Sequence, residues 1–179
     1  NTNEVIIVKV DAGTYVSSLT LDDDDDVLVT VKKEGFAFNS TYISADDTSF
    51  SSPKNLNIKL ESLENGKSFN LSNIYFETNS YQINSIAKDV LFEFTAYLKV
   101  NKNMAIEING FTDNIGNDIA NQLLSENRAK EVCELLVSYG LASDRLSYNG
   151  YGEQFPRVDN ASDSNRAQNR RTEFRIIRQ

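Results

Sequence analysis

An acidic and a basic side chain stand out in the stretch from residue 106 to residue 132, IEINGFTDNIGNDIANQLLSENRAKEV. Asp113 follows a short apolar run and lies in the polar turn that begins at Thr112, whereas Arg128 lies further on in a segment with helical spacing. A carboxylate attracts an ammonium group, and the planar fork of a guanidinium binds a carboxylate through two hydrogen bonds. The pair could therefore be a clamp for a zwitterionic ligand, a catalytic pair or a salt bridge.

Each of the two residues also has a local explanation. An aspartate in a T-D-N turn often accepts a hydrogen bond from its own backbone, and Arg128 could pair on the helix surface with nearby Glu131. For either residue alone, the local explanation is the better one. The residues around the pair decide between these explanations.

The segment that carries Arg128 places further polar residues on one face of a helix. Asn121, Leu124, Ser125 and Arg128 are separated by three, four and seven positions, so a helix presents them on the same side. Polar groups along such a face can bond the carbonyl and amide groups of a peptide. The spacing therefore favours a lined binding surface over an isolated charge pair.

Composition argues against catalysis and against nucleic acid. The 179 residues include no histidine, so the commonest general base and the commonest metal ligand are both missing. The acids are scattered over turns and exposed faces, without the placed pair that a glycoside hydrolase needs. A formal net charge of −8 disfavours phosphate-backbone partners. We expect no enzyme and no cofactor, and no apolar run approaches the length of a membrane span.

The second half of the chain predicts an α+β fold. Apolar spacing indicates a strand, a helix, a strand, a long helix, a strand, a loop and a final strand, with the helices on one side of the sheet. Gly140 is a plausible residue to follow the long helix, and Cys133 lies within it as a small buried apolar residue. The expected elements lie at residues 69–77, 84–100, 104–110, 117–139, 145–152 and 172–177.

The first half has only strand signals. The alternating or β-branched runs predict a small antiparallel sandwich from strands at 4–10, 15–21, 27–33 and 55–63. The polar turn ENGK at 64–67 predicts a boundary between a domain at 1–63 and one at 68–179. Because the chain begins at Asn1 and not at methionine, we expect a processed or excised piece whose targeting signal lies outside it.

The acidic run Asp22–Asp26 could suggest a calcium loop. An EF-hand loop that opened at Asp22 would place Val27 at the glycine position and Lys33 at the bidentate glutamate position, so the spacing fails. We interpret the run as a solvated turn whose charges discourage edge-to-edge pairing, and we expect no metal site.

Residues 68–179 resemble the OmpA-like peptidoglycan-binding domain. The resemblance rests on five motifs in the order and spacing of that family: NIYFETNSYQI, INGFTDNIGN, NQLLSENRAKEV, LSYNGYGEQFP and NRRTEF. Phe111 stands where the family usually has histidine, which we expect to alter packing more than binding. The first half resembles, in VLVTVKKEGFAFNSTYIS, part of a carboxypeptidase regulatory-like β-sandwich.

The OmpA-like resemblance implies a non-enzymatic domain that binds peptidoglycan through the diaminopimelate of its stem peptide. By that resemblance, Asp113 takes the ammonium and Arg128 takes the carboxylate. The resemblance implies that one wall of the site is lined by Asn121, Leu124, Ser125 and Thr112. The loop of Phe76, Glu77 and Thr78 forms the other wall.

The resemblance also implies a cellular setting. It predicts a periplasmic location, associated with the outer membrane, where the domain anchors an outer-membrane or periplasmic assembly to the wall. A β-sandwich joined to an OmpA-like domain is similar to the end of a multidomain protein of type IX secretion, and that assignment rests on domain order alone. The alternative is a structural interaction domain of a periplasmic complex with a degenerate ligand site.

Overall fold

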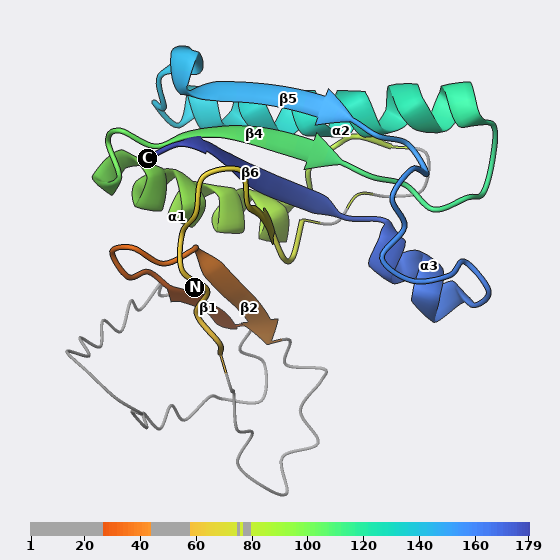
Figure 1. Cartoon of the computed structure of the whole chain (residues 1–179), viewed down its shortest axis with the longest axis horizontal. Helices are drawn as coiled ribbons and strands as arrows, with labels where there is room; N and C mark the ends of the chain where they lie inside the picture. The colour runs from red at the N-terminus through yellow and green to blue at the C-terminus, as the bar shows by residue number, and fades with distance from the viewer. Residues whose placement is uncertain (1–26, 44–57, 75, 77–79) are drawn as a thin grey trace, which may run out of the picture.

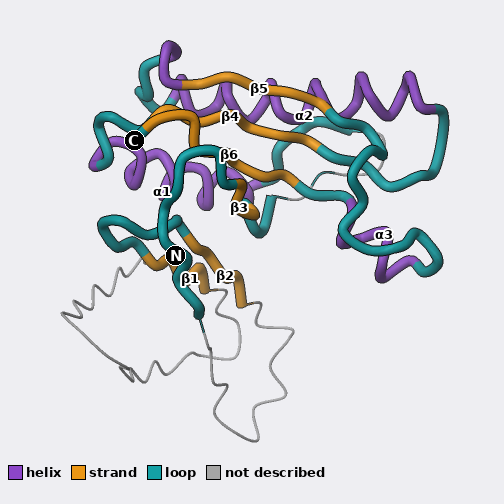
Figure 2. Tube along the Cα trace, in the orientation of Figure 1, coloured by secondary structure: helices purple, strands orange, loops and turns teal. Residues whose placement is uncertain are grey.

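A computed structural model describes residues 27–43, 58–74, 76 and 80–179. It consists of a two-stranded sheet, followed by a four-stranded sheet covered by helices (Figures 1 and 2). The elements, in chain order, are β1 Val27–Val31, β2 Asn39–Ile43, β3 Ser68–Asn70, α1 Ser85–Val100, β4 Ala105–Gly110, α2 Asp118–Ser138, the 3-10 turn η2 Ser143–Arg145, β5 Leu146–Gly150, α3 Asp163–Asn169 and β6 Thr172–Arg178.

The four-stranded sheet is mixed, with the strand order β3-β6-β4-β5. The neighbours β4 and β5 are parallel, and β6 is antiparallel to both β3 and β4. The helices α1 and α2 lie side by side on one face of this sheet (Figure 1). The predicted α+β fold is thereby confirmed.

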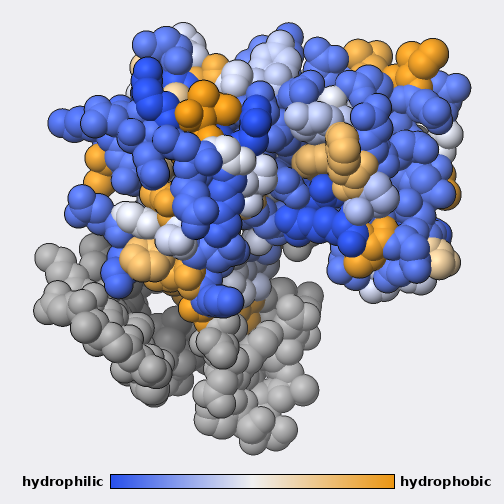
Figure 3. Space-filling view, viewed as in Figure 1, coloured by the Kyte–Doolittle hydropathy of each residue, from blue (hydrophilic) through white to orange (hydrophobic). Residues whose placement is uncertain are grey.

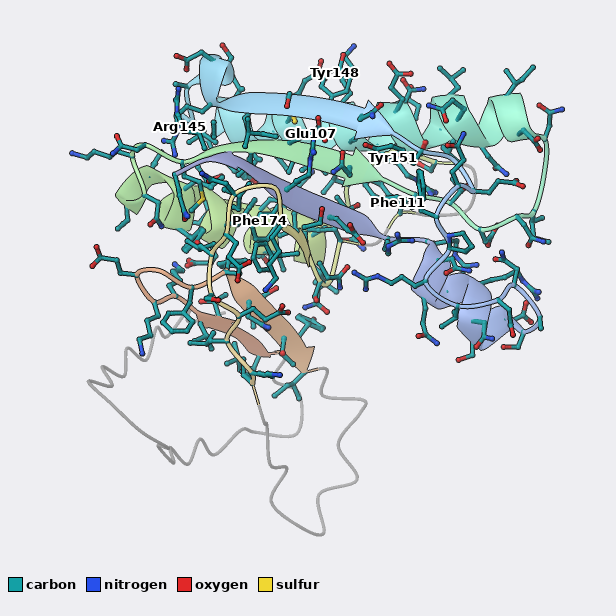
Figure 4. All side chains as sticks on the ribbon, viewed as in Figure 1. Glu107, Phe111, Arg145, Tyr148, Tyr151 and Phe174 are labelled. Carbon is teal, nitrogen blue, oxygen red and sulfur yellow. The ribbon has the colours of Figure 1, made fainter. Side chains whose placement is uncertain are left out.

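Alternation along the strands explains why only one face of the sheet carries helices. Ile106 and Ile108 of β4 and Phe174 of β6 are fully buried against α1 and α2. The intervening Glu107 points to the opposite face, where its Oε1 lies 3.0 Å from Nη2 of Arg175 (Figure 4). Each fully buried apolar side chain stabilises the fold by about 1.5–3 kcal/mol.

The two long helices begin at asparagine caps. The side chain of Asn84 accepts a hydrogen bond from the backbone of Ala87, and that of Asn117 accepts from Ile119 and Ala120. These bonds satisfy amide groups that have no partner within the helix. The predicted helices at 84–100 and 117–139 are confirmed to within one residue at each end.

Helix α2 ends at the predicted glycine. Gly140 has a φ of 88°, a conformation that costs a residue with a Cβ about 1 kcal/mol or more. The backbone N–H groups of Gly140 and Leu141 bond back to Val137 and Leu136, which satisfies carbonyls of the last turn. Cys133 lies buried in α2, as predicted.

The β1–β2 hairpin packs on the side of α1 away from the sheet (Figure 1). The ring of Phe38 lies 5.2 Å from that of Phe94 and 5.8 Å from that of Tyr97, measured between centroids. The hydroxyl of Tyr97 donates to the backbone carbonyl of Phe36 at 2.8 Å, and Lys32 forms an ion pair with Glu93. The described part of the first half therefore shares its core with the second, and the boundary near residue 64 stays a prediction.

Three predicted elements differ from the structure. The strand expected at 69–77 is only three residues long, and Phe76 forms an isolated bridge with Ile83. In the strand expected at 55–63, the described residues 58–63 form only a bridge between Ser62 and Phe36. The expected loop before β6 contains α3, which has a serine cap but no apolar periodicity to reveal it.

Some predictions fall outside the described residues. They are the strands at 4–10 and 15–21, the acidic run Asp22–Asp26 and the residues Glu77 and Thr78. Within the described part, no cluster of three acidic or cysteine residues could hold a metal ion. None of the described helices combines the length and apolar character that a membrane crossing requires.

Candidate functional site

The candidate site lies where the parallel strands β4 and β5 both end, beside the first turns of α2 (Figure 1). Hydrogen bonds join the two loops that leave these strands. The N–H of Tyr151 donates to the carbonyl of Gly110 at 3.0 Å, and the N–H of Thr112 donates to that of Gly152 at 2.8 Å. The loops therefore extend the strand pairing beyond the sheet and hold the turn of Asp113 in place.

Two paired glycines let α2 approach this end of the sheet closely. Gly110 and Gly150 are partners across β4 and β5. A Cβ on Gly110 would lie 2.2 Å from the carbonyl oxygen of Ser125, and one on Gly150 would lie 2.3 Å from the backbone nitrogen of Glu126. Only glycine fits at either position. The contact sets the distance between α2 and the ends of β4 and β5.

Asp113 makes two contacts through its two carboxylate oxygens. Oδ1 accepts a hydrogen bond from the N–H of Ile115 at 3.0 Å, which is the local turn bond considered from the sequence. Oδ2 accepts from Nη1 of Arg170 at 2.6 Å. The side chain of Asp113 is only 12% exposed. The turn bond orients the carboxylate, and Arg170 pairs with its charge.

Arg128 points from α2 toward the same region. Its Nε donates to the carbonyl of Ser80 at 2.9 Å, and its guanidinium lies 4.9 Å from the centroid of the Phe76 ring. The pKa of Arg128 is lowered to about 10, chiefly by burial and in part by the nearby charge of Arg170, while the charge of Asp113 acts in the opposite direction. The structure thus brings Asp113 and Arg128 close enough to interact electrostatically.

The predicted shared face of α2 is confirmed, because Asn121, Ser125 and Arg128 are all buried, whereas Leu124 is half-buried. The Nδ2 of Asn121 donates to Oε2 of Glu153 at 3.0 Å. The hydroxyl of Ser125 has no exposed surface: it accepts from the N–H of Gly152 and donates to the carbonyl of Gln122, both at 2.8 Å. Ser125 therefore holds the loop after β5.

Thr112 lies behind Asp113 and is nearly fully buried. Its hydroxyl oxygen has no hydrogen-bond partner among the described residues. The half-buried Phe76 contributes its ring to the Arg128 contact, whereas Glu77 and Thr78 lie outside the described residues.

Phe111 stands at the position where the resemblance predicts histidine. It packs against Tyr151 and Arg171 at the end of the sheet. Its ring stacks on that of Tyr151 at 5.2 Å between centroids, and the guanidinium of Arg171 lies 3.8 Å from its centroid. Figure 4 shows Phe111 and Tyr151 next to each other at the end of the sheet. The expectation that this residue acts in packing agrees with these contacts.

The NRRTEF motif contains Asn169, Arg170, Arg171 and Glu173, and a natural role for these residues is a network that locks the last strand. The buried Asn169 fits this, because its Oδ1 accepts from the N–H groups of Arg157 and Val158. Arg170 instead reaches Asp113. The motif NRRTEF contains two adjacent arginines, and nothing in its spacing identifies which of them reaches the site.

Residues 75–170 match the OmpA family. The chain is 46% identical to outer membrane porin F of Pseudomonas fluorescens over 71 residues, which are 40% of this chain and 22% of the porin. It is 39% identical to the peptidoglycan-binding protein ArfA of Mycobacterium bovis over 86 residues, which are 48% of this chain and 26% of that protein. The matched region thus spans about a quarter of the length of these curated relatives.

Two solved structures are similar in fold. The C-terminal domain of MotB from Helicobacter pylori superposes with a TM-score of 0.54 at 30% identity, covering 57% of this chain and 81% of that one. The peptidoglycan-associated lipoprotein of Burkholderia pseudomallei gives a TM-score of 0.53 at 26% identity, covering 59% and 88%. The matched family is non-enzymatic, as the sequence predicts.

Proposed function

The chain belongs to the OmpA family, and on that premise we propose that it binds peptidoglycan without covalent attachment, through the diaminopimelate of the stem peptide. Two similar proteins, ArfA and the peptidoglycan-associated lipoprotein, are named for association with peptidoglycan. The observation that carries the proposal is that the carboxylate of Asp113 and the guanidinium of Arg128 are held by separate contacts at the same end of the sheet, near enough for the charge of Asp113 to act on Arg128.

The two charges match the free end of diaminopimelate, which bears one ammonium and one carboxylate. The ammonium binds Oδ2 of Asp113, the oxygen that Arg170 contacts in the structure. The carboxylate binds the guanidinium of Arg128. Because both protein groups are largely buried, solvent screens their attraction to the ligand less than it would at an open surface.

Rigid contacts prepare both groups for binding. The turn bond from Ile115 orients the carboxylate, and the bond to Ser80 and the Phe76 ring orient the guanidinium. Groups held in place before binding lose less conformational entropy when the ligand arrives. The desolvation that lowers the pKa of Arg128 is offset when a ligand carboxylate pairs with it.

The proposal assigns the walls of the site as the family resemblance implies. Asn121, Leu124 and Thr112 form the wall on the side of α2, with Ser125 as the residue that holds its loop. On the opposite side, Phe76 contacts the guanidinium of Arg128. By the family resemblance, Glu77 and Thr78, which lie outside the described residues, belong to the same wall.

The proposed role is to anchor a cell-envelope assembly to the wall from the periplasm, in association with the outer membrane. Membership of the OmpA family supports this location. A part in type IX secretion is the narrower prediction from domain order. The competing proposal is an interaction domain whose site no longer binds ligand. It predicts that purified peptidoglycan does not retain the protein.

The test is co-sedimentation with purified diaminopimelate-type sacculi, with and without free meso-diaminopimelate as competitor. We expect Asp113→Asn and Arg128→Gln to weaken binding at least about tenfold, which corresponds to about 1.4 kcal/mol for each lost charged contact. The matched controls are Glu107→Gln and Arg175→Gln, because these residues form a comparable ion pair on the helix-free face of the sheet.

The outcomes separate the two proposals. Wild-type binding that meso-diaminopimelate displaces, together with loss in the two site variants only, supports the zwitterion clamp. Equal retention of all variants contradicts it. A wild-type protein that sacculi do not retain favours the interaction domain with a degenerate site.

A further inference from the structure

A cavity of about 440 Å³ lies between the turn after β3 and the helix α3. Three arginines line it: Arg157, Arg170 and Arg171. The other described lining residues are polar or apolar and include Ser72, Ser164 and Gln168, and none of them is acidic. Figure 3 shows a largely hydrophilic surface on the face of the molecule in view. Three guanidinium groups around one hollow are unusual in a chain of net charge −8.

The carboxylates behind the cavity do not neutralise the three arginines. A single oxygen, Oε1 of Glu173, pairs with Nη2 of Arg157 at 3.0 Å and with Nε of Arg171 at 2.7 Å. Asp113 pairs with Arg170 at 2.6 Å. Three positive charges therefore share two negative ones, which leaves the cavity with an excess positive charge. Burial lowers the pKa of Arg171, the hydrogen bond and the charge of Glu173 act in the opposite direction, and the charge of Arg157 adds a smaller lowering effect.

The arginines differ in the hydrogen bonds that they can still donate. All three nitrogens of the Arg171 guanidinium are engaged, by Glu173, the carbonyl of Asn169 and the carbonyl of Phe155. Arg157 uses only Nη2 among the described contacts, so its Nε and Nη1 can donate to a ligand. Its backbone is fixed by Asn169, whose Oδ1 accepts the Arg157 N–H at 2.8 Å. Arg157 is therefore a positioned donor with spare capacity.

Arg170 connects this cavity to the proposed zwitterion site. It lines the cavity and at the same time donates to Oδ2 of Asp113. The Asp113 carboxylate and the cavity are therefore separated by no more than the length of the Arg170 side chain. The stem peptide carries other carboxylates besides the one at the zwitterionic end, namely the α-carboxyl of its D-glutamate and its C-terminal carboxyl.

We propose that the cavity lined by Arg157, Ser164 and Gln168 is a second anion subsite, which binds a further carboxylate of the same stem peptide. This subsite rests on the proposed function, because it assumes that diaminopimelate occupies the Asp113–Arg128 clamp. A guanidinium with free N–H groups in a partly enclosed cavity is the preferred protein partner for a carboxylate. The subsite distinguishes peptides by a charge that lies outside the clamp.

The experiment measures dissociation constants by calorimetry for three peptides. They are L-Ala-γ-D-Glu-meso-diaminopimelate, the same peptide amidated at the D-glutamate α-carboxyl, and the same peptide amidated at its C-terminal carboxyl. We expect wild type to bind one amidated form about three- to tenfold more weakly, as for the loss of one charged contact at a half-exposed site. The weakened form identifies which carboxylate occupies the subsite.

Two variants test the residue itself. Arg157→Gln is expected to bind that amidated form and the unmodified peptide equally. Arg175→Gln is expected to keep the wild-type preference, and it is matched because Arg175 is 40% exposed against 42% for Arg157 and also forms a 3.0 Å ion pair. Equal binding of all three peptides by wild type, or a preference that survives Arg157→Gln, overturns the subsite and leaves the clamp intact. Wild type that binds none of the peptides overturns the proposed function as well.

Discussion

Asp113 and Arg170 form an ion pair across 57 positions of sequence, with 2.6 Å between Oδ2 and Nη1. The two partners differ in exposure, since the side chain of Arg170 is 47% exposed and that of Asp113 is 12% exposed. The arginine can swing into solvent at little cost, whereas the acid is held by its turn bond to Ile115. Arg170 therefore behaves as a removable counter-ion that competes with a ligand ammonium for Asp113.

Removal of Arg170 should strengthen the binding of a minimal zwitterion. D-alanine is a suitable probe, because it has one ammonium and one carboxylate and no second anion. We expect Arg170→Gln to bind D-alanine about threefold more tightly or better in an NMR titration, since the ammonium no longer displaces a guanidinium. Arg175→Gln should leave the affinity unchanged. Weaker binding by Arg170→Gln would show instead that Arg170 positions Asp113 for the ligand.

Arg128 is expected to reduce stability while it serves binding. Its burial lowers its pKa to about 10, which means that the folded protein disfavours the charged side chain. At neutral pH this desolvation costs on the order of 1–3 kcal/mol, before the bond to Ser80 and the Phe76 contact offset part of it. Arg128→Met keeps an unbranched side chain of similar length beside Phe76. We expect it to raise the free energy of unfolding by about 1 kcal/mol in urea at pH 7 and to abolish peptide binding.

The control for this prediction is Arg175→Met, which removes an arginine of the exposed Glu107 ion pair. We expect the control to unfold at the wild-type urea concentration or slightly below it. If Arg128→Met unfolds earlier than wild type, the contacts of the guanidinium outweigh its desolvation.

Tyr97 should hold the β1–β2 hairpin to α1 through one hydrogen bond. Its hydroxyl donates to the carbonyl of Phe36 at 2.8 Å, and burial raises its pKa to about 12. We expect Tyr97→Phe to lower the free energy of unfolding by about 1 kcal/mol at pH 8. Tyr148→Phe is the matched control, because Tyr148 is well exposed, and it should change nothing.

The pH dependence of the Tyr97 effect has a definite sign. An unfolded tyrosine loses its proton near pH 10, whereas folded Tyr97 keeps it until about pH 12. The stabilisation by Tyr97 is therefore fully present below pH 10 and is lost as the pH rises through 12. The difference in unfolding free energy between wild type and Tyr97→Phe should shrink across that window. A difference that stays constant up to pH 12 would contradict the assignment.

Gly110→Ala should disturb both stability and binding. The added Cβ would lie 2.2 Å from the carbonyl oxygen of Ser125, so α2 must move, and such overpacking costs about 1–3 kcal/mol. A displaced α2 carries Arg128 with it, and we expect weaker binding of meso-diaminopimelate. Gly66→Ala is the informative comparison, because an added Cβ there meets no atom within 4 Å but adopts a strained φ of 82°. It should lower the urea midpoint while leaving the affinity unchanged.

Elements with strong local signals could be predicted from the sequence. Helix α1 has apolar periodicity and α2 is followed by Gly140, and the predicted bounds of both agree with the structure to within one residue. The short helix α3 was missed because its seven residues, DSNRAQN, contain no apolar stripe. Strand β2 was missed for a similar reason, since the alternation in NSTYI is weak and its pairing with β1 is decided by tertiary packing.

For the site, the sequence predicted the shared face of Asn121, Ser125 and Arg128, because helical spacing is a local property. It could not predict that the hydroxyl of Ser125 is turned inward to the loop after β5, since that depends on how closely α2 approaches the sheet. The Asp113–Arg170 pair was equally out of reach, because no local pattern links residues 57 positions apart.

The close approach at Gly110 and Gly150 has a consequence for how ligand preference could change over time. The nearest atoms of α2 there are main-chain atoms of Ser125 and Glu126, so a side chain at either glycine would separate α2 from the strand ends. Substitutions that keep both glycines preserve the close approach of α2, the helix that carries Arg128, to the strand end that precedes Asp113. New ligand preferences must therefore arise at residues outside this contact, such as Phe76, Arg157 and Arg170, which can be exchanged while the scaffold is conserved.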